Sequence, residues 1–348
     1  MSGNLQWRVA RYVDPGETLG AEHFTLHDGD IPSIADGEFL VRTLAFGTSP
    51  AQRGYIDGRK ADQVPIGDVM RGRSIAVVHE SRHPDFSPGD WVNASTGWQQ
   101  WSVQSIDRPN VQNMNVLSVQ KVDNSLRPST LHLGLLGSAA FTAVHGLHAV
   151  GELKAGNTVV VSAAAGGVGS VACRVAKLAR ARVVGVAGGP EKCRWVTDVL
   201  GADACIDYKA GELTEPLLEL CPEGVDVFFD NVGGTILNSV LPNLAIGARV
   251  VICGYISTDY SADELPGPSN YKYLLRKRAS MEGFVIWDHT DRFGEYFEQL
   301  RAWYLGGELP AQIEDVSDGI ETLPDALRSL FIGANRGIRL VRVGDDSG

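Results

Sequence analysis

The stretch TVVVSAAAGGVGSVACRVAKLARA, from Thr158 to Ala181, decides the fold class of this 348-residue chain. A continuous apolar run is followed by small residues and then by apolar residues at helical spacing, which predicts strand, tight turn and helix. Ala164, Gly166 and Gly169 hold the three small positions of a dinucleotide-binding turn. The middle glycine lets the backbone approach a pyrophosphate, and the helix N-terminus offers N–H donors to it. On these residues alone, a tight turn that binds nothing remains an alternative.

Beyond this unit, apolar strands alternate with helical segments. After the strand that begins at Thr158, further strands are expected at 182–187, 204–208, 225–232, 249–254 and 280–286. A helix is expected over 129–150, immediately before the first of them. Six strands separated by helices predict a parallel sheet that is covered by helices on both faces, as in a doubly wound Rossmann domain.

The part of the chain before residue 130 has a different pattern. It is rich in Gly, Pro and Asp, lacks helical periodicity, and contains short strand-like runs at 39–44, 73–79 and 90–94. This pattern predicts an all-β, barrel-like unit. The last apolar run, 338–343, has no evident sheet partner in its neighbourhood and is a candidate to rejoin the N-terminal unit.

Composition narrows the class of protein. With 31 Lys and Arg against 42 Asp and Glu, the net charge is −11, which disfavours nucleic acid and anionic membranes as partners. No apolar run is long enough to span a bilayer, and the N-terminus lacks a signal-peptide core, so we expect a cytoplasmic protein. The five cysteines show no C-x-x-C spacing and are expected to be free thiols in a reducing compartment.

The residues after the second strand bear on cofactor choice. An NAD site usually places an acid about 20 residues beyond the turn. Here the strand ends in Val186–Gly189 without one, Lys192 and Arg194 follow, and Tyr208 closes the third strand. A missing carboxylate with nearby cations suits a 2′-phosphate and favours NADPH. That Lys192 and Arg194 are simply solvated helix residues is an equal alternative.

Several motifs add to this pattern. They are AAAGGVGS, GVAGGPEKCRW, LGAD…IDYK, VDVFFDNVGG and VVICGYIST, with GDVMRGRSIAVVHESRHPDFSPGDWV and GWQQWSV before them and GANRGIRLV near the end. Together they resemble the medium-chain dehydrogenase/reductase superfamily. Within it, the chain is similar to the zinc-independent branch of NADP-dependent alkenal/one double-bond reductases, which includes leukotriene B4 12-hydroxydehydrogenase/prostaglandin reductases and curcumin reductases. The resemblance covers nearly the whole chain.

The resemblance implies an α/β fold in which a Rossmann domain with a six-stranded doubly wound sheet accompanies a GroES-like β-barrel domain. The expected division is a GroES-like catalytic domain at 1–130, a Rossmann NADP-binding domain at 131–308, and a segment at 309–348 that returns to the catalytic domain. A homodimer is expected from the family alone.

The resemblance also implies a set of NADPH-binding residues. Gly166, Gly167, Val168 and Gly169 are expected at the pyrophosphate, and Lys192 and Tyr208 at the adenosine 2′-phosphate. The other expected cofactor residues are Asn231, Cys253, Gly254, Tyr255, Ile256, Ser257, Thr258, Phe284, Val285, Ile286 and Asn335. For Cys253 plain packing is the favoured alternative, and it remains open for Phe284.

No metal site is expected. Zinc enzymes of the superfamily carry an early Cys and a Gly-His-Glu motif, but here Gly47–Pro50 and Gly67–Met70 contain neither Cys nor His. His79 and His83 lie near Glu80 in the sequence, and we interpret them as surface groups. Without a Lewis acid, oxidation of a simple alcohol is disfavoured. The chemistry that remains is hydride transfer to the β-carbon of an activated alkene, such as an α,β-unsaturated ketone or aldehyde.

Such a reaction produces an enolate and needs one hydrogen-bond donor for the developing oxyanion. The family places a Tyr just after the Ile-Ser-Thr run, which makes Tyr260 the candidate catalytic donor, because a phenol stays protonated at neutral pH. A loop Tyr that serves as a lid or packing residue is the alternative. The additional Asp259 also leaves the register open.

Two departures from the family concern the substrate side. Ala51 stands where relatives carry an active-site Tyr, with Tyr55 as a displaced substitute, and Ser138 stands in a stretch that usually reads Gly-Met-Pro-Gly. We expect a remodelled and roomier pocket. The aromatic residues proposed as its walls are Trp98, Trp101, Tyr271 and Trp287. Core packing explains them equally well, and a quinone reductase, a carbonyl reductase and a low-turnover NADPH-binding protein remain alternative functions.

Overall fold

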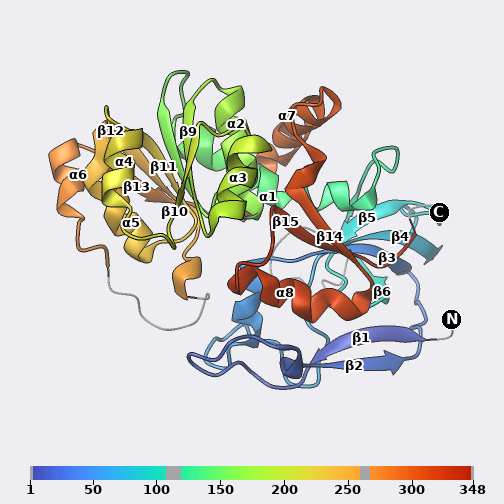
Figure 1. Cartoon of the computed structure of the whole chain (residues 1–348). Coiled ribbons are helices and arrows are strands. Elements are labelled where there is room, and N and C mark those ends of the chain that lie inside the picture. Colours follow the sequence, from blue (N-terminus) through green and yellow to red (C-terminus); the bar gives the residue numbers. More distant parts are fainter. Residues whose placement is uncertain (1–2, 107–118, 259–266, 346–348) are drawn as a thin grey trace.

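The structure is a computed structural model that describes residues 3–106, 119–258 and 267–345. Two large sheets lie side by side, one in each of two domains, with the chain passing from the first domain to the second and back (Figure 1). A separate two-stranded sheet of β1 (Asn4–Val9) and β2 (Phe24–Gly29) belongs to the N-terminal part. No helix among the described residues is both long and apolar enough to cross a membrane.

The Rossmann sheet has six parallel strands, which confirms the fold predicted from the βα pattern. Its spatial order is β10 (Ala204–Asp207), β9 (Arg182–Ala187), β8 (Thr158–Ser162), β11 (Val225–Asp230), β12 (Leu244–Ile252) and β13 (Ser280–Gly283). In chain order this is 3-2-1-4-5-6, the arrangement of doubly wound dinucleotide-binding sheets. The order reverses between β8 and β11, and such a switch point is where ligands bind.

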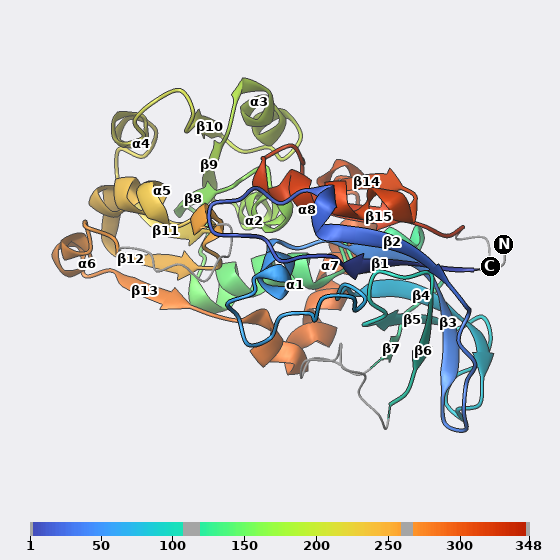
Figure 2. The same ribbon diagram turned by 90° about the horizontal axis from the view of Figure 1, so that it is seen from below.

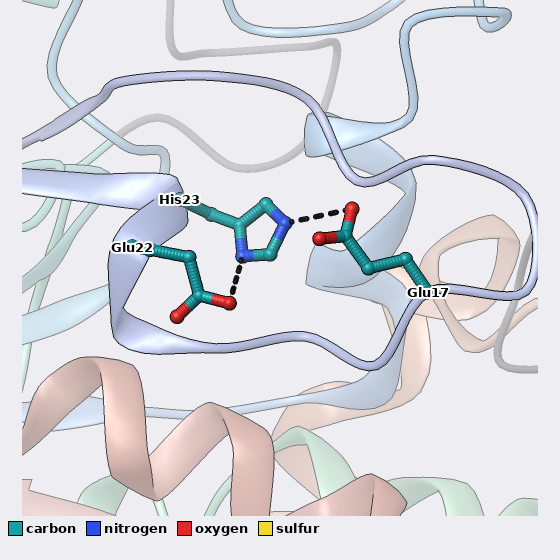
Figure 3. Close-up of side chains that lie close together, drawn as sticks. All are labelled: Glu17, Glu22 and His23. Atoms are coloured by element: carbon teal, nitrogen blue, oxygen red, sulfur yellow. Dashed lines mark ion pairs between the residues drawn. The ribbon is translucent and has the colours of Figure 1, made fainter.

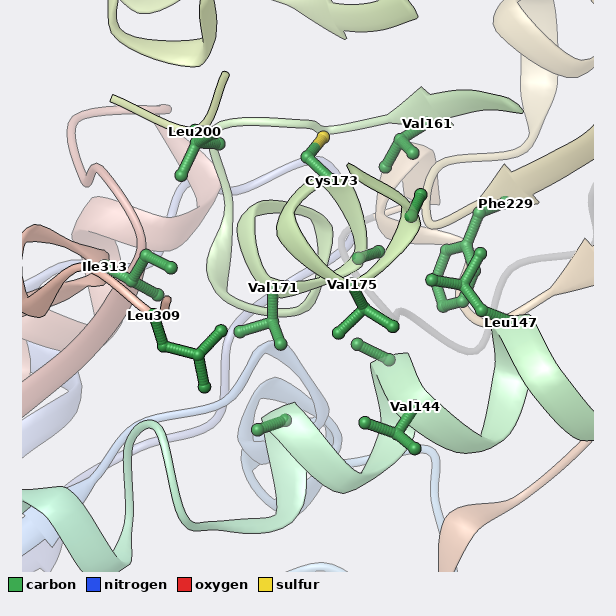
Figure 4. Close-up of a cluster of buried hydrophobic side chains, with 14 of the residues drawn as sticks. Val144, Leu147, Val161, Val171, Cys173, Val175, Leu200, Phe229, Leu309 and Ile313 are labelled. Atoms are coloured by element: carbon green, nitrogen blue, oxygen red, sulfur yellow. The ribbon is translucent and has the colours of Figure 1, made fainter. Parts of the chain in front are cut away.

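Helices cover both faces of this sheet because β8 directs alternate valines to opposite sides. Val159 and Val161 belong to the core shared with α1 (Ser138–His145), α2 (Gly167–Leu178) and α7 (Phe293–Leu305). Val160 belongs to the core on the other face. The helices associated with that face are α4 (Thr214–Leu220), α5 (Gly234–Val240) and α6 (Lys272–Lys277). Figure 4 shows Val171 and Val175 of α2 facing Val144 of α1.

The N-terminal domain is built on a seven-stranded sheet. Along its main path the order is β14 (Glu314–Asp318), β15 (Ile338–Arg342), β3 (Phe39–Gly47), β4 (Ser74–Ser81), β5 (Trp91–Ala94) and β7 (Gln120–Lys121), and β6 (Trp101–Gln104) pairs with β3. The last strand, β15, pairs antiparallel with β3 and parallel with β14. Figure 2 shows these C-terminal strands, in red, beside the blue and cyan strands of the N-terminal part. Helix α8 (Leu323–Phe331) connects β14 to β15, and α3 (Pro190–Asp198) connects β9 to β10.

The expected continuous helix over 129–150 is wrong. The segment forms a 3-10 helix at Ser129–His132, then α1, and then a π-helical turn at Gly146–Val150. A contact with a residue distant in sequence explains the interruption, because Glu314 of β14 accepts hydrogen bonds from the backbone N–H of Leu135 (3.0 Å) and from the hydroxyl of Thr130 (3.0 Å). The expected strand 280–286 likewise ends at Gly283, which leaves Phe284 and Val285 beyond the sheet.

Candidate cofactor and substrate cleft

A cleft of about 1920 Å³ runs along the carboxyl ends of the Rossmann strands and extends to the N-terminal domain. The predicted cofactor residues that line it are Gly166, Gly167, Val168, Gly169, Lys192, Tyr208, Asn231, Cys253, Gly254, Tyr255, Ile256, Ser257, Phe284, Val285, Ile286 and Asn335. Thr258 ends the turn Ile256–Thr258, and its side chain is outside what the structure describes. Tyr260 lies outside the described residues. The fold therefore brings residues from seven separate segments of the chain to one cavity.

The turn after β8 is shaped by close backbone contacts. Gly166 donates its N–H to the carbonyl of Ala163 (2.8 Å) and precedes α2, which begins at Gly167. A Cβ on Gly169 would lie 2.2 Å from the same carbonyl oxygen, so only glycine allows the helix to start this close to the strand. The first N–H groups of α2 have no partners within the helix, and they offer an anion site in the cleft.

Asp230 ties the ends of β8 and β11 together. Its carboxylate accepts hydrogen bonds from the Ser162 hydroxyl (2.8 Å) and from the backbone N–H groups of Val232 (3.0 Å) and Gly233 (3.0 Å). Burial raises the pKa of Asp230, and these donors oppose that rise. The amide of Asn231 donates to the Ser162 carbonyl (2.7 Å), which fixes this side chain at the cleft wall. Sequence reasoning missed Asp230, although an acid that ends an apolar strand was a visible signal.

Cations gather beyond the end of β9. Lys192 is half-buried; burial lowers its pKa, and the positive charges of Lys209 and Arg336 lower it further. Lys209 also lines the cleft, whereas Arg194, on the same helix as Lys192, is exposed and does not. Neighbouring like charges are unfavourable unless an anion binds among them. The sequence reasoning missed Lys209, which lies in the turn after β10, and Arg336, which lies in the segment before β15.

Asp207 holds the backbone around this cation cluster. Its carboxylate accepts the N–H of Gly189 (2.7 Å) and the N–H of Lys209 (3.0 Å). Gly189 has φ = 94°, in the left-handed region where glycine is favoured. A Cβ on Gly188 would lie 2.9 Å from the Tyr208 hydroxyl oxygen, so the glycine pair after β9 leaves room for that side chain.

The opposite part of the cleft is lined by residues of the N-terminal domain and α1. Ala51, Tyr55 and Ser138 all line it, so both departures from the family pattern face the cavity. Tyr55 lies under the guanidinium of Arg71, whose Cζ is 5.2 Å from the ring centroid. Burial raises the pKa of Tyr55, which keeps its phenol protonated and able to donate.

The aromatic walls differ from those expected. Trp287 lines the cleft, but Trp98, Trp101 and Tyr271 do not. Trp98 is fully buried beside Phe24 in the core of the N-terminal domain, Trp101 packs edge-on against His79, and Tyr271 is 68% exposed. Other aromatic residues take their place. The cleft-lining members are Phe141 of α1 and Phe293 and Phe297 of α7.

Comparison with known proteins identifies the family. A profile described as the N-terminal domain of oxidoreductase matches residues 6–112, and one described as zinc-binding dehydrogenase matches residues 167–302. The chain belongs to the medium-chain dehydrogenase/reductase family, in its branch of NADP-dependent alkenal and enone reductases. The resemblance identified from the motifs is therefore confirmed, as is the pairing of a GroES-like domain with a Rossmann domain.

Individual relatives are similar over nearly their full length. The chain is 38% identical over 360 residues to the NADPH-dependent curcumin reductase of Escherichia coli, covering 99% of this chain and 100% of that protein. It is 33% identical over 310 residues to the NADP(+)-dependent 2-alkenal reductase of Nicotiana tabacum, covering 88% and 87%. The crystal structure of CurA from Vibrio vulnificus in complex with NADPH superimposes with a TM-score of 0.88 at 35% identity, covering 98% and 99%.

The residues of the cleft do not fit the zinc site that the second profile's description implies. Among the described lining residues, the only Cys and His side chains are Cys253 and His132, and the His132 ring nitrogen lies 3.2 Å from the Leu126 carbonyl. The stretches where zinc ligands were considered contribute Gly47, Thr48, Ser49 and Pro50 to the lining. No step of the chemistry below is therefore assigned to a metal ion.

One group of acids and histidine does cluster elsewhere in the described residues. The carboxylates of Glu17 and Glu22 lie beside the buried ring of His23. His23 Nε2 is 3.2 Å from Glu17, and His23 Nδ1 is 3.9 Å from Glu22 (Figure 3). Arg11 donates to the same Glu17 carboxylate (2.9 Å), and this bond is the main cause that lowers the pKa of Glu17. We interpret the group as an ion-pair network that holds the loop before β2, because a guanidinium already neutralises the carboxylate that a cation would need.

Proposed function

We infer that this protein is an NADPH-dependent oxidoreductase that reduces the C=C bond of α,β-unsaturated ketones and aldehydes. The observation that carries the inference is a single cleft with a glycine turn and a cation cluster at one end and phenol and aromatic groups at the other. The relatives named above carry NADPH-dependent curcumin reductase and 2-alkenal reductase as their names. A reductase of activated alkenes needs a cofactor site and a substrate pocket of this kind, and its reaction does not require a metal ion.

The residues present fit NADPH. The N–H groups at the start of α2 suit the pyrophosphate, and Lys192 with Lys209 and Arg336 suits a doubly charged 2′-phosphate. We assign the remaining predicted residues, from Asn231 to Asn335, to the walls around the ribose and nicotinamide halves. When bound, NADPH supplies the hydride that adds to the β-carbon of the alkene.

The chain must stabilise the negative charge that develops on the carbonyl oxygen. We assign this role to the phenol of Tyr260, on the family's pattern, with Tyr55 as the described alternative because it lines the cleft and stays protonated. The aromatic side chains of Trp287, Phe141 and Phe293 would hold the apolar body of the alkene and exclude water from the reacting carbons.

An acceptor panel tests the function. Enones, quinones and saturated aldehydes are supplied separately with NADPH and with NADH, and cofactor oxidation and products are measured. Saturated ketones from enones, with NADPH preferred, are the expected result. Quinone turnover alone indicates a quinone reductase, allylic alcohols indicate a carbonyl reductase, and NADPH binding without turnover indicates a binding protein.

We propose that the catalytic domain comprises 1–130 and 309–348 and that the Rossmann domain comprises 131–308. The pairing of β15 with β3 supports this division, because it ties the C-terminal segment to the N-terminal sheet. Limited proteolysis followed by mass mapping tests it. Cuts that fall near residues 130 and 308, with fragments that stay associated, are expected.

We also propose a homodimer joined through the edge of the Rossmann sheet. β13 is the terminal strand of that sheet, and among the described strands only β12 pairs with it. Leu275 (83% exposed) and Val285 (55% exposed) flank it, and exposed apolar groups at a strand edge favour pairing with another chain. Light scattering should give twice the mass of the chain, and Leu275→Asp should give the single-chain mass.

A cytoplasmic location is proposed from the cysteines. All five are free thiols in this fold, and such thiols persist in a reducing compartment. Fractionation of cells that express the tagged protein tests this location.

A further inference from the structure

Two thiols meet between α3 and β10, beside the cation cluster of the cleft. The Cys205 thiol, on β10, donates to the sulfur of Cys193, on α3, and the two Sγ atoms are 2.9 Å apart. Both cysteines are free and partly exposed in this fold. The sulfurs of a disulfide are about 2.05 Å apart, so an approach of about 0.9 Å would join these two atoms. The function proposed above gives this pair no role.

Backbone contacts connect the two cysteines to the cation cluster. Cys193 directly follows Lys192 in the first turn of α3, and its N–H donates to the carbonyl of Gly189 (3.1 Å). On the other element, Asp207 lies two residues after Cys205 and accepts the N–H of the same Gly189 (2.7 Å). The turn after β9 is therefore held from both α3 and β10. A change in the spacing of these two elements moves Lys192 relative to the rest of the cluster.

The two thiols differ in acidity. Burial raises the pKa of both, but the hydrogen bond between them opposes this rise at Cys193 and adds to it at Cys205. Cys193 is therefore the easier thiol to deprotonate, and the thiolate is the form that reacts with an oxidant. The Cys205 sulfur is close enough to attack an oxidised Cys193 sulfur. The raised pKa values slow the first step, so the thiols stay reduced until an oxidant accumulates.

We propose that Cys193 and Cys205 form a reversible disulfide in response to hydrogen peroxide and that this bond weakens the binding of NADPH. The Cys193 thiolate attacks one peroxide oxygen and the O–O bond breaks, which gives a sulfenic acid and a hydroxide that takes up a proton. The Cys205 sulfur then attacks the Cys193 sulfur, and the S–OH bond breaks as the Cys205 proton leaves with the hydroxide in a second water. Two thiols thus lose two electrons and two protons, and one peroxide becomes two waters. A small dithiol reverses the bond by thiol–disulfide exchange.

The effect on the cofactor follows from the place of Lys192. Closing the S–S bond draws the first turn of α3 and β10 together, and Lys192 moves with its neighbour Cys193. An ammonium group that is displaced from a phosphate loses part of a charge-assisted hydrogen bond. This effect rests on the NADPH site proposed above, whereas formation of the disulfide does not.

Mass mapping tests the bond. The full-length protein is treated with hydrogen peroxide, its remaining thiols are alkylated, and its peptides are mapped before and after reduction with dithiothreitol. We expect a peptide pair joined through Cys193 and Cys205, which is lost in Cys193→Ala and in Cys205→Ala. The matched control Cys221→Ala removes a buried thiol at the end of α4 and should keep the bond. Absence of the bond in the wild type, or a bond from Cys205 to Cys173 instead, overturns the proposal.

Calorimetry with NADPH tests the effect on the cofactor. The Kd for NADPH should rise about threefold or more in the oxidised wild type, and dithiothreitol should restore it. Cys205→Ala treated with peroxide in the same way should keep its Kd. An unchanged Kd in fully cross-linked wild type overturns the proposed effect. Reduced wild type that binds no NADPH contradicts the cofactor site instead, and the mass map decides on the disulfide independently of that result.

Discussion

The hydroxyl of Ser162, at the end of β8, donates a 2.8 Å hydrogen bond to the fully buried carboxylate of Asp230, at the end of β11. This bond joins the two strands between which the sheet order reverses, and the same carboxylate orders the turn that follows β11. The position of the cofactor cleft therefore depends on one buried acid.

Replacing that acid should affect both stability and cofactor binding. Asp230→Ala leaves the Ser162 hydroxyl and two backbone N–H groups without their acceptor, so we expect the free energy of unfolding to fall by about 2–4 kcal/mol. The KM for NADPH should rise, because Ser162, which holds the Asn231 side chain, is no longer fixed by the Asp230 carboxylate. Urea unfolding and steady-state kinetics measure the two effects. Asp226→Ala is the control, since Asp226 accepts the N–H of Thr158 (2.8 Å) at the opposite end of the strands. An unchanged KM in Asp230→Ala would contradict the account.

Lys192→Ala should raise the KM for NADPH about tenfold or more and leave the KM for NADH nearly unchanged. The reason is that only NADPH carries the 2′-phosphate that the ammonium group would pair with. Lys209→Ala should act in the same direction. Arg194→Ala removes the same charge from the same helix outside the cleft and should change neither KM. Equal effects of the Lys192 and Arg194 variants would point to the general field of the helix instead.

The proton donor to the enolate oxygen is assigned by two tyrosine variants. Tyr260→Phe should lower kcat about a hundredfold with little change in the KM for NADPH, since the phenol acts on charge that develops in the transition state. Tyr55→Phe should have a small effect if Tyr260 is the donor. The reverse pattern assigns the role to Tyr55, and unchanged kcat in both variants removes a phenol from the mechanism.

The stability of the protein should fall below neutral pH because of His145. Burial, with the nearby His289 and Arg292, lowers the pKa of His145 from 6.5 to about 4. The folded protein keeps this ring neutral at pH values where the unfolded chain protonates it, so stability decreases as the pH drops from 6.5 toward 4. The loss amounts to at most about 3 kcal/mol.

Thermal unfolding of His145→Gln across this pH window measures that contribution. The variant should have a shallower dependence on pH than the wild type. Tyr296→Phe is the control, because it deletes the 2.7 Å contact between the Tyr296 hydroxyl and His145 Nδ1 but keeps the buried imidazole. Parallel curves for wild type and His145→Gln would show that another group causes the slope.

Sequence reasoning predicted the features that depend on neighbouring residues. The valines of β8 and the glycines before α2 specify strand, turn and helix locally. Lys192 follows the second strand closely in the sequence, so its place near that strand's end was predictable. Contacts between distant segments were not predictable in this way. Glu314 interrupts the helix after Thr130 from 184 residues away along the chain.

The same limit applies to the site. Arg336 comes to Lys192 from the segment before β15, and no spacing rule connects the two. The residue type of an aromatic side chain indicates its size but not whether it faces the core or the cleft. Trp98 lies in the core, whereas Trp287 lines the cleft. Asn335 was predicted only from the family resemblance. It precedes β15, whose partner strand β3 lies near the other end of the chain.

The central claim is hydride transfer from NADPH to the β-carbon of an activated alkene. NADPH deuterated at the transferred position, incubated with the enzyme and benzylideneacetone, tests it through NMR of the product. The account predicts a saturated ketone with one deuterium on the former β-carbon. Deuterium on the carbonyl carbon of an allylic alcohol, or recovery of the enone without label while NADPH remains bound, would contradict it.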